Sequence, residues 1–415
     1  MKIRIRKHST LSLEHILFFV ALFCVVSFAL LENMSITIPA FSALKNPMLY
    51  LAGICIMAHI FPLLRVLKKK RYFYVMLVLA LFCGILYLFS ELNDRPIAGS
   101  AHQRGTVRLI LYLADLFFLM IWAAETGRGQ KVLNFLFGYL LIMTFATDLL
   151  LFTSFIVFSN GREIGYLVGT KFTVAYFHIN LLTFWFIQKK QQLFSDRKAK
   201  RIMMLGLPAI VFISIYVDCL TGIFGCIVML IMFAMMNTPF QRKMLRLNSP
   251  VVLVLALTGS VLFPFLAEQI VSIPFVTDFL QNTLNKNTNL TGRLNIYMFY
   301  AEKMQGHWLM GFGYGNANIA ASALFGYANT QNGLLQWILQ IGVPNTLLLV
   351  LLMATILYWM NKSKASLQCM PLVILIYLYI FIGMIEITFD MSFLLWFALL
   401  FMLSAESNRS ITTTK

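Results

Sequence analysis

Runs of about twenty apolar residues recur along this chain of 415 residues, and no other feature limits its fold as strongly. The hydrocarbon core of a bilayer offers no water to backbone N–H and C=O groups. A segment that crosses it therefore forms a helix, which bonds these groups internally. About twenty helical residues span that core. We expect an all-α polytopic membrane protein.

Twelve segments have the length and apolar character of a membrane-spanning helix. They lie near residues 14–31, 47–64, 72–90, 107–123, 132–152, 171–187, 202–217, 219–236, 250–271, 334–359, 371–387 and 389–404. We expect the seventh and eighth to form a tight hairpin, and 334–359 to be either a tilted or a broken helix. The composition agrees, because 60% of the residues are hydrophobic, whereas soluble proteins are about 45–50% apolar. One integral membrane domain is predicted over residues 1–415.

The basic residues orient the predicted helices. If the N-terminal "MKIRIRKH" is cytoplasmic, twelve spans place both termini on that side, together with "RVLKKKR", "QKKQQLFSDRKAKR" and "QRKMLR". Of the 33 Lys and Arg residues, 24 then lie inside and nine outside, which is the charge bias typical of membrane proteins. Topology thus explains the net charge of +17, and nucleic-acid binding is not predicted. No small-x-small cleavage site follows "FVALFCVVSFALL", so we expect the first apolar run to remain as a helix.

One predicted outer loop is long, covering residues 272–333 between the ninth and tenth spans. Apolar residues recur in it at helical spacing, which predicts an amphipathic helix on the outer surface. The stripe consists of Leu294, Met298, Ala301 and Met304, with Ile296, Phe299 and Tyr300 on its flank. The helix is either a packing lid or a lid over a site that faces lipid headgroups. The "GFGYG" that follows lacks the strand and helix of a nucleotide loop, and we expect its glycines to allow a tight turn.

Nine cations on the predicted outer side are candidates for binding an anion. They are Lys45, Arg95, Arg104, Arg108, Arg162, Lys171, Lys286, Arg293 and Lys303. Arginine presents a planar fork that matches phosphate oxygens, so a diphosphate is a plausible ligand. For Lys45, Lys286 and Lys303 we favour ordinary solvation in a loop over anion binding. Snorkelling from a helix end is the alternative for Arg108 and Lys171. Arg293 opens the amphipathic segment, and we favour a functional role for it.

Acidic residues near the outer helix ends are candidates for a general base. Asp218 lies in "YVDCLTG", at the turn between the seventh and eighth spans. It is our first choice for the base that removes the proton of a sugar hydroxyl. Glu268, Glu386 and Asp390 also lie near outer ends. Ionisable residues inside spans often mark sites, but we interpret Asp115 and Asp148 as structural hydrogen-bond partners. His59 and His178 are interpreted as buried, whereas His102 and His307 stay open as site residues. The six cysteines lie in or at the ends of apolar runs without metal-ligand spacing, so no metal or cofactor is predicted.

The order of these features resembles the O-antigen polymerase and O-antigen ligase superfamily of bacterial cell-surface polysaccharide assembly. Its members carry a long outer loop in the C-terminal third, with "TGR", an aromatic-rich helix, a glycine-rich stretch and a segment like "HN..L......G". The matching positions here are Thr291-Gly292-Arg293, Gly311 to Gly315, and Gln331-Asn332 through Gly342. "GYLVGTKFTVAYFHI", which contains Lys171, also resembles the outer end of a span in Wzy-type capsular polymerases. The resemblance is firmest from about residue 165 to 345.

Two departures from the family pattern favour a polymerase over a ligase. The ligase branch has a histidine where Gln331 stands. It also tends to carry an arginine in the loop between the seventh and eighth spans, where "DCLTG" has none.

The resemblance implies a GT-C-like glycosyltransferase bundle that works at the outer face of the cytoplasmic membrane. Its substrates would be undecaprenyl-diphosphate-linked oligosaccharides among membrane lipids, and a chain-length regulator is a further partner to consider. Cations would stabilise the leaving diphosphate without a metal or cofactor. The first choices are Arg293, Lys171 and Arg162, and then Arg95, Arg104 and Arg108. Gln331, Asn332 and Tyr314 would bind and orient the sugar hydroxyls.

Two other functions remain open from the sequence. A ligase would pass the finished glycan to another acceptor, and the absence of the family's histidine weakens that interpretation. A flippase for the same lipid-linked units would show inverted repeats and helices broken at the membrane midplane. The candidate charges here gather at one face instead.

Overall fold

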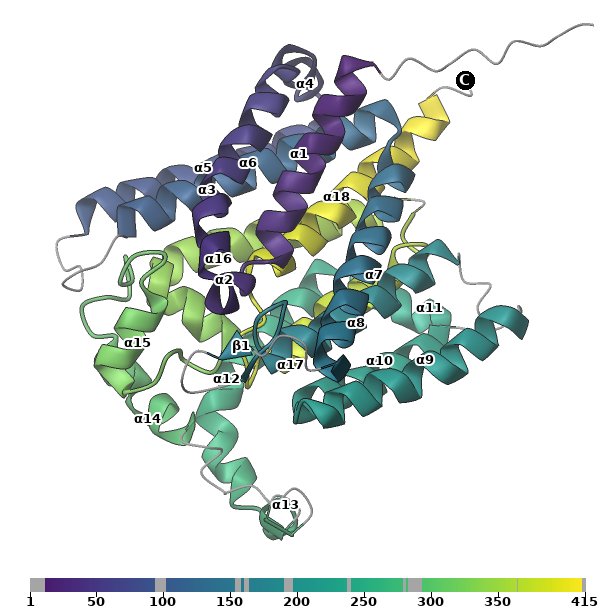
Figure 1. Ribbon diagram of the computed structural model, residues 1–415. Coiled ribbons are helices and arrows are strands. Elements are labelled where there is room, and N and C mark those ends of the chain that lie inside the picture. The colour runs from purple at the N-terminus through teal and green to yellow at the C-terminus, as the bar shows by residue number, and fades with distance from the viewer. Residues whose placement is uncertain are drawn as a thin grey trace, which may run out of the picture.

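A computed structural model describes residues 12–93, 102–153, 158–159, 164–189, 197–236, 240–278, 281–282, 293–363 and 365–412. These parts of the chain are helical apart from turns and two short strands, β1 (Phe158–Ser159) and β2 (Ile164–Gly165), which pair antiparallel. The helices pack side by side as one bundle (Figure 1).

A helix lies at each of the twelve predicted segments. These are α1 (Leu13–Leu30), α3 (Pro39–Met57), α5 (Lys70–Leu92), α6 (His102–Thr126), α7 (Gly129–Thr153), α8 (Lys171–Gln188), α9 (Arg197–Tyr216), α10 (Leu220–Met236), α12 (Pro250–Val271), α16 (Gly333–Asn361), α17 (Met370–Ile382) and α18 (Met391–Thr412). Seven of them are long and apolar enough to cross a membrane, namely α1, α3, α5, α6, α7, α12 and α16. Shorter apolar helices lie within α9, α10, α17 and α18. The all-α, multi-pass class predicted from the sequence is therefore confirmed.

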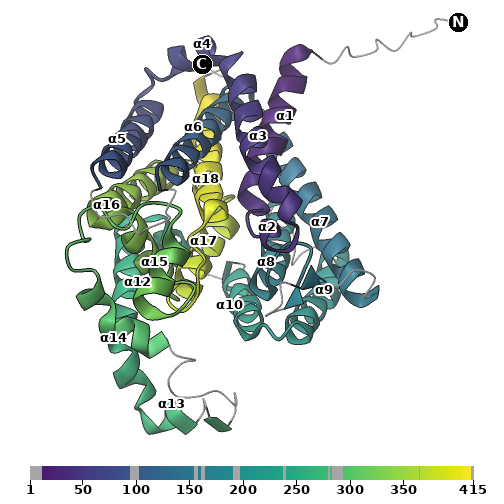
Figure 2. The ribbon, with the colours of Figure 1, turned by 60° about the vertical axis from the view of Figure 1, so that its left-hand side comes forward.

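Short helices join the long ones. They are α2 (Met34–Thr37), α4 (Ile60–Val66), α11 (Gln241–Met244), a 3₁₀ turn (Leu245–Asn248), α13 (Pro274–Asp278), α14 (Arg293–Lys303) and α15 (Ala317–Phe325). Both views place α4, the start of α1 and the end of α18 at one end of the bundle, and α13 and α14 toward the other (Figures 1 and 2). We call the end that carries α13 and α14 the outer end, following the orientation predicted from the basic residues.

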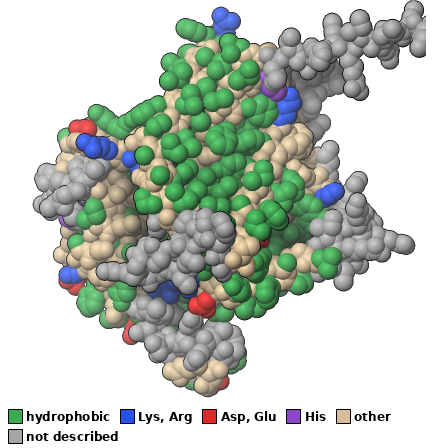
Figure 3. Space-filling view, in the orientation of Figure 1, with side chains coloured by type: hydrophobic (Ala, Val, Ile, Leu, Met, Phe, Trp, Pro, Cys, Tyr) green, Lys and Arg blue, Asp and Glu red, His purple; other side chains and the backbone are tan. Residues whose placement is uncertain are grey.

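The core and the lipid-facing surface use different helices. Most of the apolar stretch of α6 is buried, and Phe393, Trp396 and Phe397 of α18 are fully buried beside it. By contrast, Ile54 and Met57 of α3 are mostly exposed. Apolar side chains cover the middle of the face in Figure 3, and most of the charged ones lie toward its margins. Such an apolar middle is what a bilayer would cover.

Helix α16 is broken, which decides between the two alternatives for residues 334–359. Gly342 has φ 72° and ψ 173° inside the helix, and Pro344 follows it. The chain from Trp308 to Phe312 packs against this break. The Phe312 N–H donates to the Leu339 carbonyl at 2.8 Å, and the Val343 N–H donates to the Trp308 carbonyl at 2.8 Å. The glycines make turns, as expected, since Gly311, Gly313 and Gly315 have positive φ angles. The segment also satisfies backbone groups at the break in α16.

Helix α14 confirms a helix in the long loop, but it buries a different face from the one expected. Its buried side chains are Ile296, Tyr297 and Tyr300, joined by Met304 just after the helix. Met298 and Ala301 of the predicted stripe are exposed, as is Phe299. Tyr297 and Tyr300 explain why α14 buries this face. Their hydroxyls donate to the backbone carbonyls of Gln331 and Leu335, at 2.9 and 2.7 Å.

Candidate functional site

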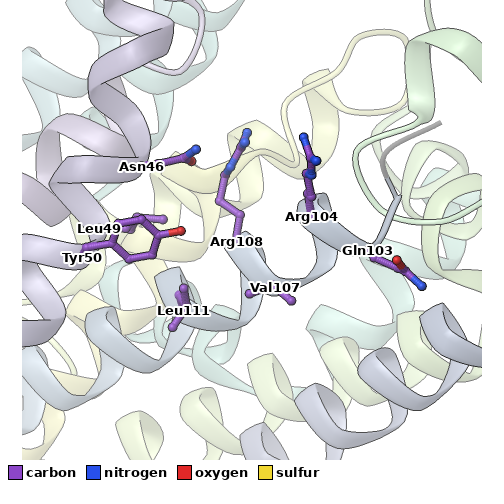
Figure 4. A pocket seen from close by; sticks show the side chains of 8 residues that line it. All are labelled: Asn46, Leu49, Tyr50, Gln103, Arg104, Val107, Arg108 and Leu111. Atoms are coloured by element: carbon purple, nitrogen blue, oxygen red, sulfur yellow. The ribbon is translucent and has the colours of Figure 1, made fainter. Parts of the chain in front are cut away.

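One face of α6 carries three polar residues at successive turns toward the outer end, namely Arg104, Arg108 and Tyr112. Residues four apart on a helix lie on the same side, one above the other. Figure 4 shows the guanidinium groups of Arg104 and Arg108 extending from α6 in the same direction. Arg104 is exposed and Arg108 is half-buried. The Nε atom of Arg108 is buried and makes no hydrogen bond to the part of the chain that the structure describes.

These arginines line a pocket of about 370 Å³ between α3 and α6. Its other lining residues are Asn46, Leu49, Tyr50, Gln103, Val107 and Leu111. Pockets for small ligands are about 300–1,000 Å³ and place a few polar groups among apolar ones. The pocket is thus large enough for a diphosphate, with two forked donors on α6 and with Asn46, Leu49 and Tyr50 of α3 facing them.

The start of α18 lies at the deeper end of this polar face. The Tyr112 hydroxyl donates to the Met391 carbonyl at 2.8 Å. Asp390 caps the helix, since its Oδ1 accepts from the Ser392 and Phe393 N–H groups at 3.0 and 3.1 Å and from the Ser392 hydroxyl at 2.6 Å. The Glu32 carboxylate accepts from the Met391 N–H. Two carboxylates therefore meet at one helix N-terminus, where the macrodipole favours negative charge.

Burial and charge set the protonation of these two carboxylates. Burial raises the pKa of Glu32, while Lys45 and Arg108 act in the opposite direction. Burial, followed by the nearby Glu32, raises the pKa of Asp390 to about 6, against the hydrogen bonds from Ser392 and Phe393. Asp390 thus exchanges its proton close to neutral pH. We call Glu32, Lys45, Arg104, Arg108, Tyr112, Tyr314 and Asp390 the α6 site.

A second polar group, which we call the Arg293 site, joins α14, α8 and the segment before α18. Arg293 forms an ion pair with Glu386, and its Nε donates to the Ile385 carbonyl at 3.0 Å. The Nζ atom of Lys171 lies 3.4 Å from Oδ2 of Asp218. Burial raises the pKa of Glu386, and Arg293 and then Lys171 oppose that rise. The structure therefore places Arg293, Lys171 and Asp218 in one region, and each cation there already faces a carboxylate.

The surroundings of Asp218 differ from those of a shielded base. Its side chain is 85% exposed, and its φ of 52° places it in the left-handed turn between α9 and α10. That turn is the tight hairpin expected from the sequence.

The remaining predicted site residues fall in different places. Asn332 is fully buried and caps α16, because its Oδ1 accepts from the Leu334 and Leu335 N–H groups and its Nδ2 donates to the carbonyls of Ser260 and Met384. Gln331 adopts φ 55° beside it and is partly exposed. Tyr314 belongs to the α6 site, with its hydroxyl 4.0 Å from the Met391 sulfur. Arg95, Arg162 and the Thr291-Gly292 pair lie outside the described residues.

Sequence reasoning missed Glu32 and Tyr112 and gave Asp390 second rank. A usable signal was present for Tyr112, because it continues the four-residue spacing of Arg104 and Arg108. Glu32 stands directly after the first apolar run, at its outer end. No pattern in the sequence indicates that Glu32 and Tyr112 lie next to the start of the last helix.

Comparisons with family models, with curated proteins and with solved structures find no match for this chain. Its chemistry is therefore inferred from its own residues. Among the described residues, no group of three or more His, Cys, Asp and Glu side chains could hold a metal ion.

The Arg293–Glu386 pair gives a prediction about stability. Arg293→Ala should lower the free energy of unfolding by about 3 kcal/mol, because it leaves a buried carboxylate without its partner. Arg293 and Glu386 are only 21% and 10% exposed, so solvent screens the pair weakly. The measurement is thermal unfolding in detergent. The double variant Arg293→Ala/Glu386→Ala should recover part of the loss, and equal losses in the single and double variants would contradict the pairing.

Proposed function

We propose that this protein is a glycosyltransferase that polymerises undecaprenyl-diphosphate-linked oligosaccharide repeat units at the outer face of the cytoplasmic membrane. The observation that carries the proposal is the pocket of Arg104 and Arg108, which lies at the outer end of α6 near the half-buried carboxylates Glu32 and Asp390. Lipid-linked sugars present a diphosphate at the membrane surface, and a pair of arginine forks suits that group. The resemblance to O-antigen polymerases supports the same chemistry.

The proposed topology has twelve spans, with both termini cytoplasmic and the reaction outside. The seven long apolar helices support this topology, and so do the shorter apolar helices in α9, α10, α17 and α18. Helix α8 (Lys171–Gln188) is the remaining span of the twelve in this topology. The basic residues then concentrate on the cytoplasmic side. A bundle of this kind would be of the GT-C type.

In the proposed reaction, a hydroxyl of the acceptor's terminal sugar attacks the anomeric carbon of the donor glycan. The bond between that carbon and the diphosphate oxygen breaks, and the diphosphate leaves with the electron pair. Arg104 and Arg108 would stabilise the charge that develops on it, because preorganised donors lower the barrier most where charge appears. Arg293 and Lys171 would act on the glycan side, where their carboxylate partners leave little net positive charge.

Reconstitution tests the proposal. Purified protein in liposomes, supplied with purified lipid-linked repeat units as the only substrate, should produce a ladder of longer glycans. The ladder should persist in EDTA, and its loss there would overturn the metal-independent part. Transfer only to an added lipid or protein acceptor would identify a ligase. Transport of the units without any lengthening would identify a flippase and exclude the polymerase.

A further inference from the structure

We infer that Asp390, held at the N-terminus of α18, is the general base that removes the proton from the attacking sugar hydroxyl. The inference rests on the proposed function and moves this role from Asp218, the first choice from the sequence, to Asp390. It depends on three features of the site: a fixed carboxylate orientation, a position next to the arginine face of α6, and a half-buried polar environment.

The carboxylate of Asp390 is fixed by the helix that it caps. All three hydrogen bonds from Ser392 and Phe393 go to Oδ1. The Oδ2 atom takes part in none of them. One oxygen therefore holds the side chain in place while the other is left to accept a proton, and a base held in this way needs no reorganisation when the hydroxyl arrives.

Helix α6 connects Asp390 to the proposed diphosphate pocket. Tyr112 bonds to the backbone of Met391, the residue after Asp390, and Arg108 and Arg104 follow at one and two turns toward the outer end. A helix rises about 1.5 Å per residue, so each of these turns adds about 6 Å. A diphosphate on the arginines would thus place its attached sugar near the start of α18, within reach of a base there.

Charged and titratable groups on several neighbouring elements interact with Asp390. Glu32 follows α1, Tyr112 belongs to α6, Tyr314 precedes α15, and Tyr176 and Tyr379 belong to α8 and α17. Arg108 and Lys45 act on Glu32. Asp390 is therefore the inner member of a carboxylate pair whose outer member faces the cations.

The proton balance of the step follows from this arrangement. The acceptor oxygen forms a bond to the anomeric carbon of the donor and gives its proton to Oδ2 of Asp390. The carbon–oxygen bond to the diphosphate breaks at the same time, and the leaving group carries away its electron pair. After the product moves away, Asp390 returns the proton to water.

Other carboxylates fit this role less well. Asp218 is mostly exposed and lies beside Lys171. Glu386 is committed to its ion pair with Arg293. Burial raises the pKa of Glu32, but Glu32 faces the cations Lys45 and Arg108, which oppose that rise. Burial raises the pKa of Asp390 to about 6, which suits a base working near neutral pH.

Asp390→Asn separates catalysis from capping. Asparagine caps helices as well as aspartate does, so the thermal midpoint and the binding of undecaprenyl diphosphate, followed by native mass spectrometry, should stay at the wild-type level. The rate of lengthening should fall by about 10²- to 10⁴-fold, the usual contribution of a general base. Asp278→Asn, the same change at an exposed outer position in α13, should leave the rate unchanged.

The dependence of the lengthening rate on pH distinguishes a base from a helix cap, because a residue that only caps α18 would not set that dependence. A base must be deprotonated to act, so the wild-type rate should rise as the pH increases through about 6. Glu32→Gln removes the neighbouring negative charge that raises the pKa of Asp390, so the rise should move to lower pH. A wild-type rate and profile in Asp390→Asn would overturn this inference alone. A wild-type protein that lengthens no glycan would overturn the proposed function itself.

Discussion

Replacing Arg104 and Arg108 together with alanine should abolish glycan lengthening while the protein stays folded in the membrane. Both arginines line one pocket, and both project from the same side of α6 (Figure 4). Removing one donor that stabilises developing negative charge typically slows a reaction by about 10²- to 10³-fold. The double variant should therefore lose at least about 10³-fold in rate, measured with the reconstituted protein and lipid-linked repeat units.

Single variants at the same pocket refine this prediction. Arg108→Lys keeps the charge but loses the fork that binds two phosphate oxygens at once, so its rate should lie between those of the wild type and Arg108→Ala. Lys303→Ala removes another outer cation, which is exposed at the end of α14, away from the pocket. It should leave the rate unchanged. Normal chain lengths from the double arginine variant would exclude the pocket from the reaction.

The positions of the helices could be predicted from the sequence because they depend on a local property, the length of an apolar run. Even there the start of α3 was missed. The sequence placed it at residue 47, whereas the helix begins at Pro39 and contains Pro47. Proline is well tolerated in the first turn of a helix, so Pro39 is a suitable start, and the polar residues between the two prolines hid it from a search for apolar runs.

The orientation of α14 shows why an apolar pattern alone was insufficient. Apolar or aromatic residues occupy almost every position from 296 to 300, so two faces of the helix fit the pattern equally well. The structure chooses the face whose tyrosine hydroxyls reach backbone carbonyls at the start of α16. A buried hydroxyl without a partner would cost free energy, and the position of that partner is a property of the tertiary fold.

The types of residue in the candidate site could be predicted from the sequence, but the particular residues that contact one another could not. The sequence indicated outer arginines and carboxylates, and these residue types do gather at the outer end. Their partners come from distant parts of the chain, as with Arg293 and Glu386 or Tyr112 and Met391. No spacing rule links such positions. Two of the three cations given first rank, Arg293 and Lys171, are paired with carboxylates, while the two second-ranked arginines in the described chain line a pocket.

The break in α16 gives the second large prediction, because Gly342 has a backbone conformation that is essentially restricted to glycine. Its φ of 72° and ψ of 173° lie where any other residue is strained. A Cβ atom placed there would lie 2.1 Å from the Leu309 carbonyl oxygen and 2.6 Å from the carbonyl carbon. Both neighbours are backbone atoms of the segment that packs on the break. Neither can move without disturbing the hydrogen bonds of Phe312 and Val343 across the break.

Gly342→Ala should therefore destabilise the protein by about 3 kcal/mol or more, because a steric clash adds to a backbone strain of about 1–3 kcal/mol. The midpoint of thermal unfolding in detergent should fall, and glycan lengthening should be lost with it, because the same loop carries Tyr314 against the start of α6. Gly259→Ala is the matched control. Gly259 lies in α12 with nothing within 4 Å of its Cβ position, and alanine is the better helix former by about 1 kcal/mol. Its midpoint should stay the same or rise, and a comparable fall in both variants would show that the break at Gly342 has no special role.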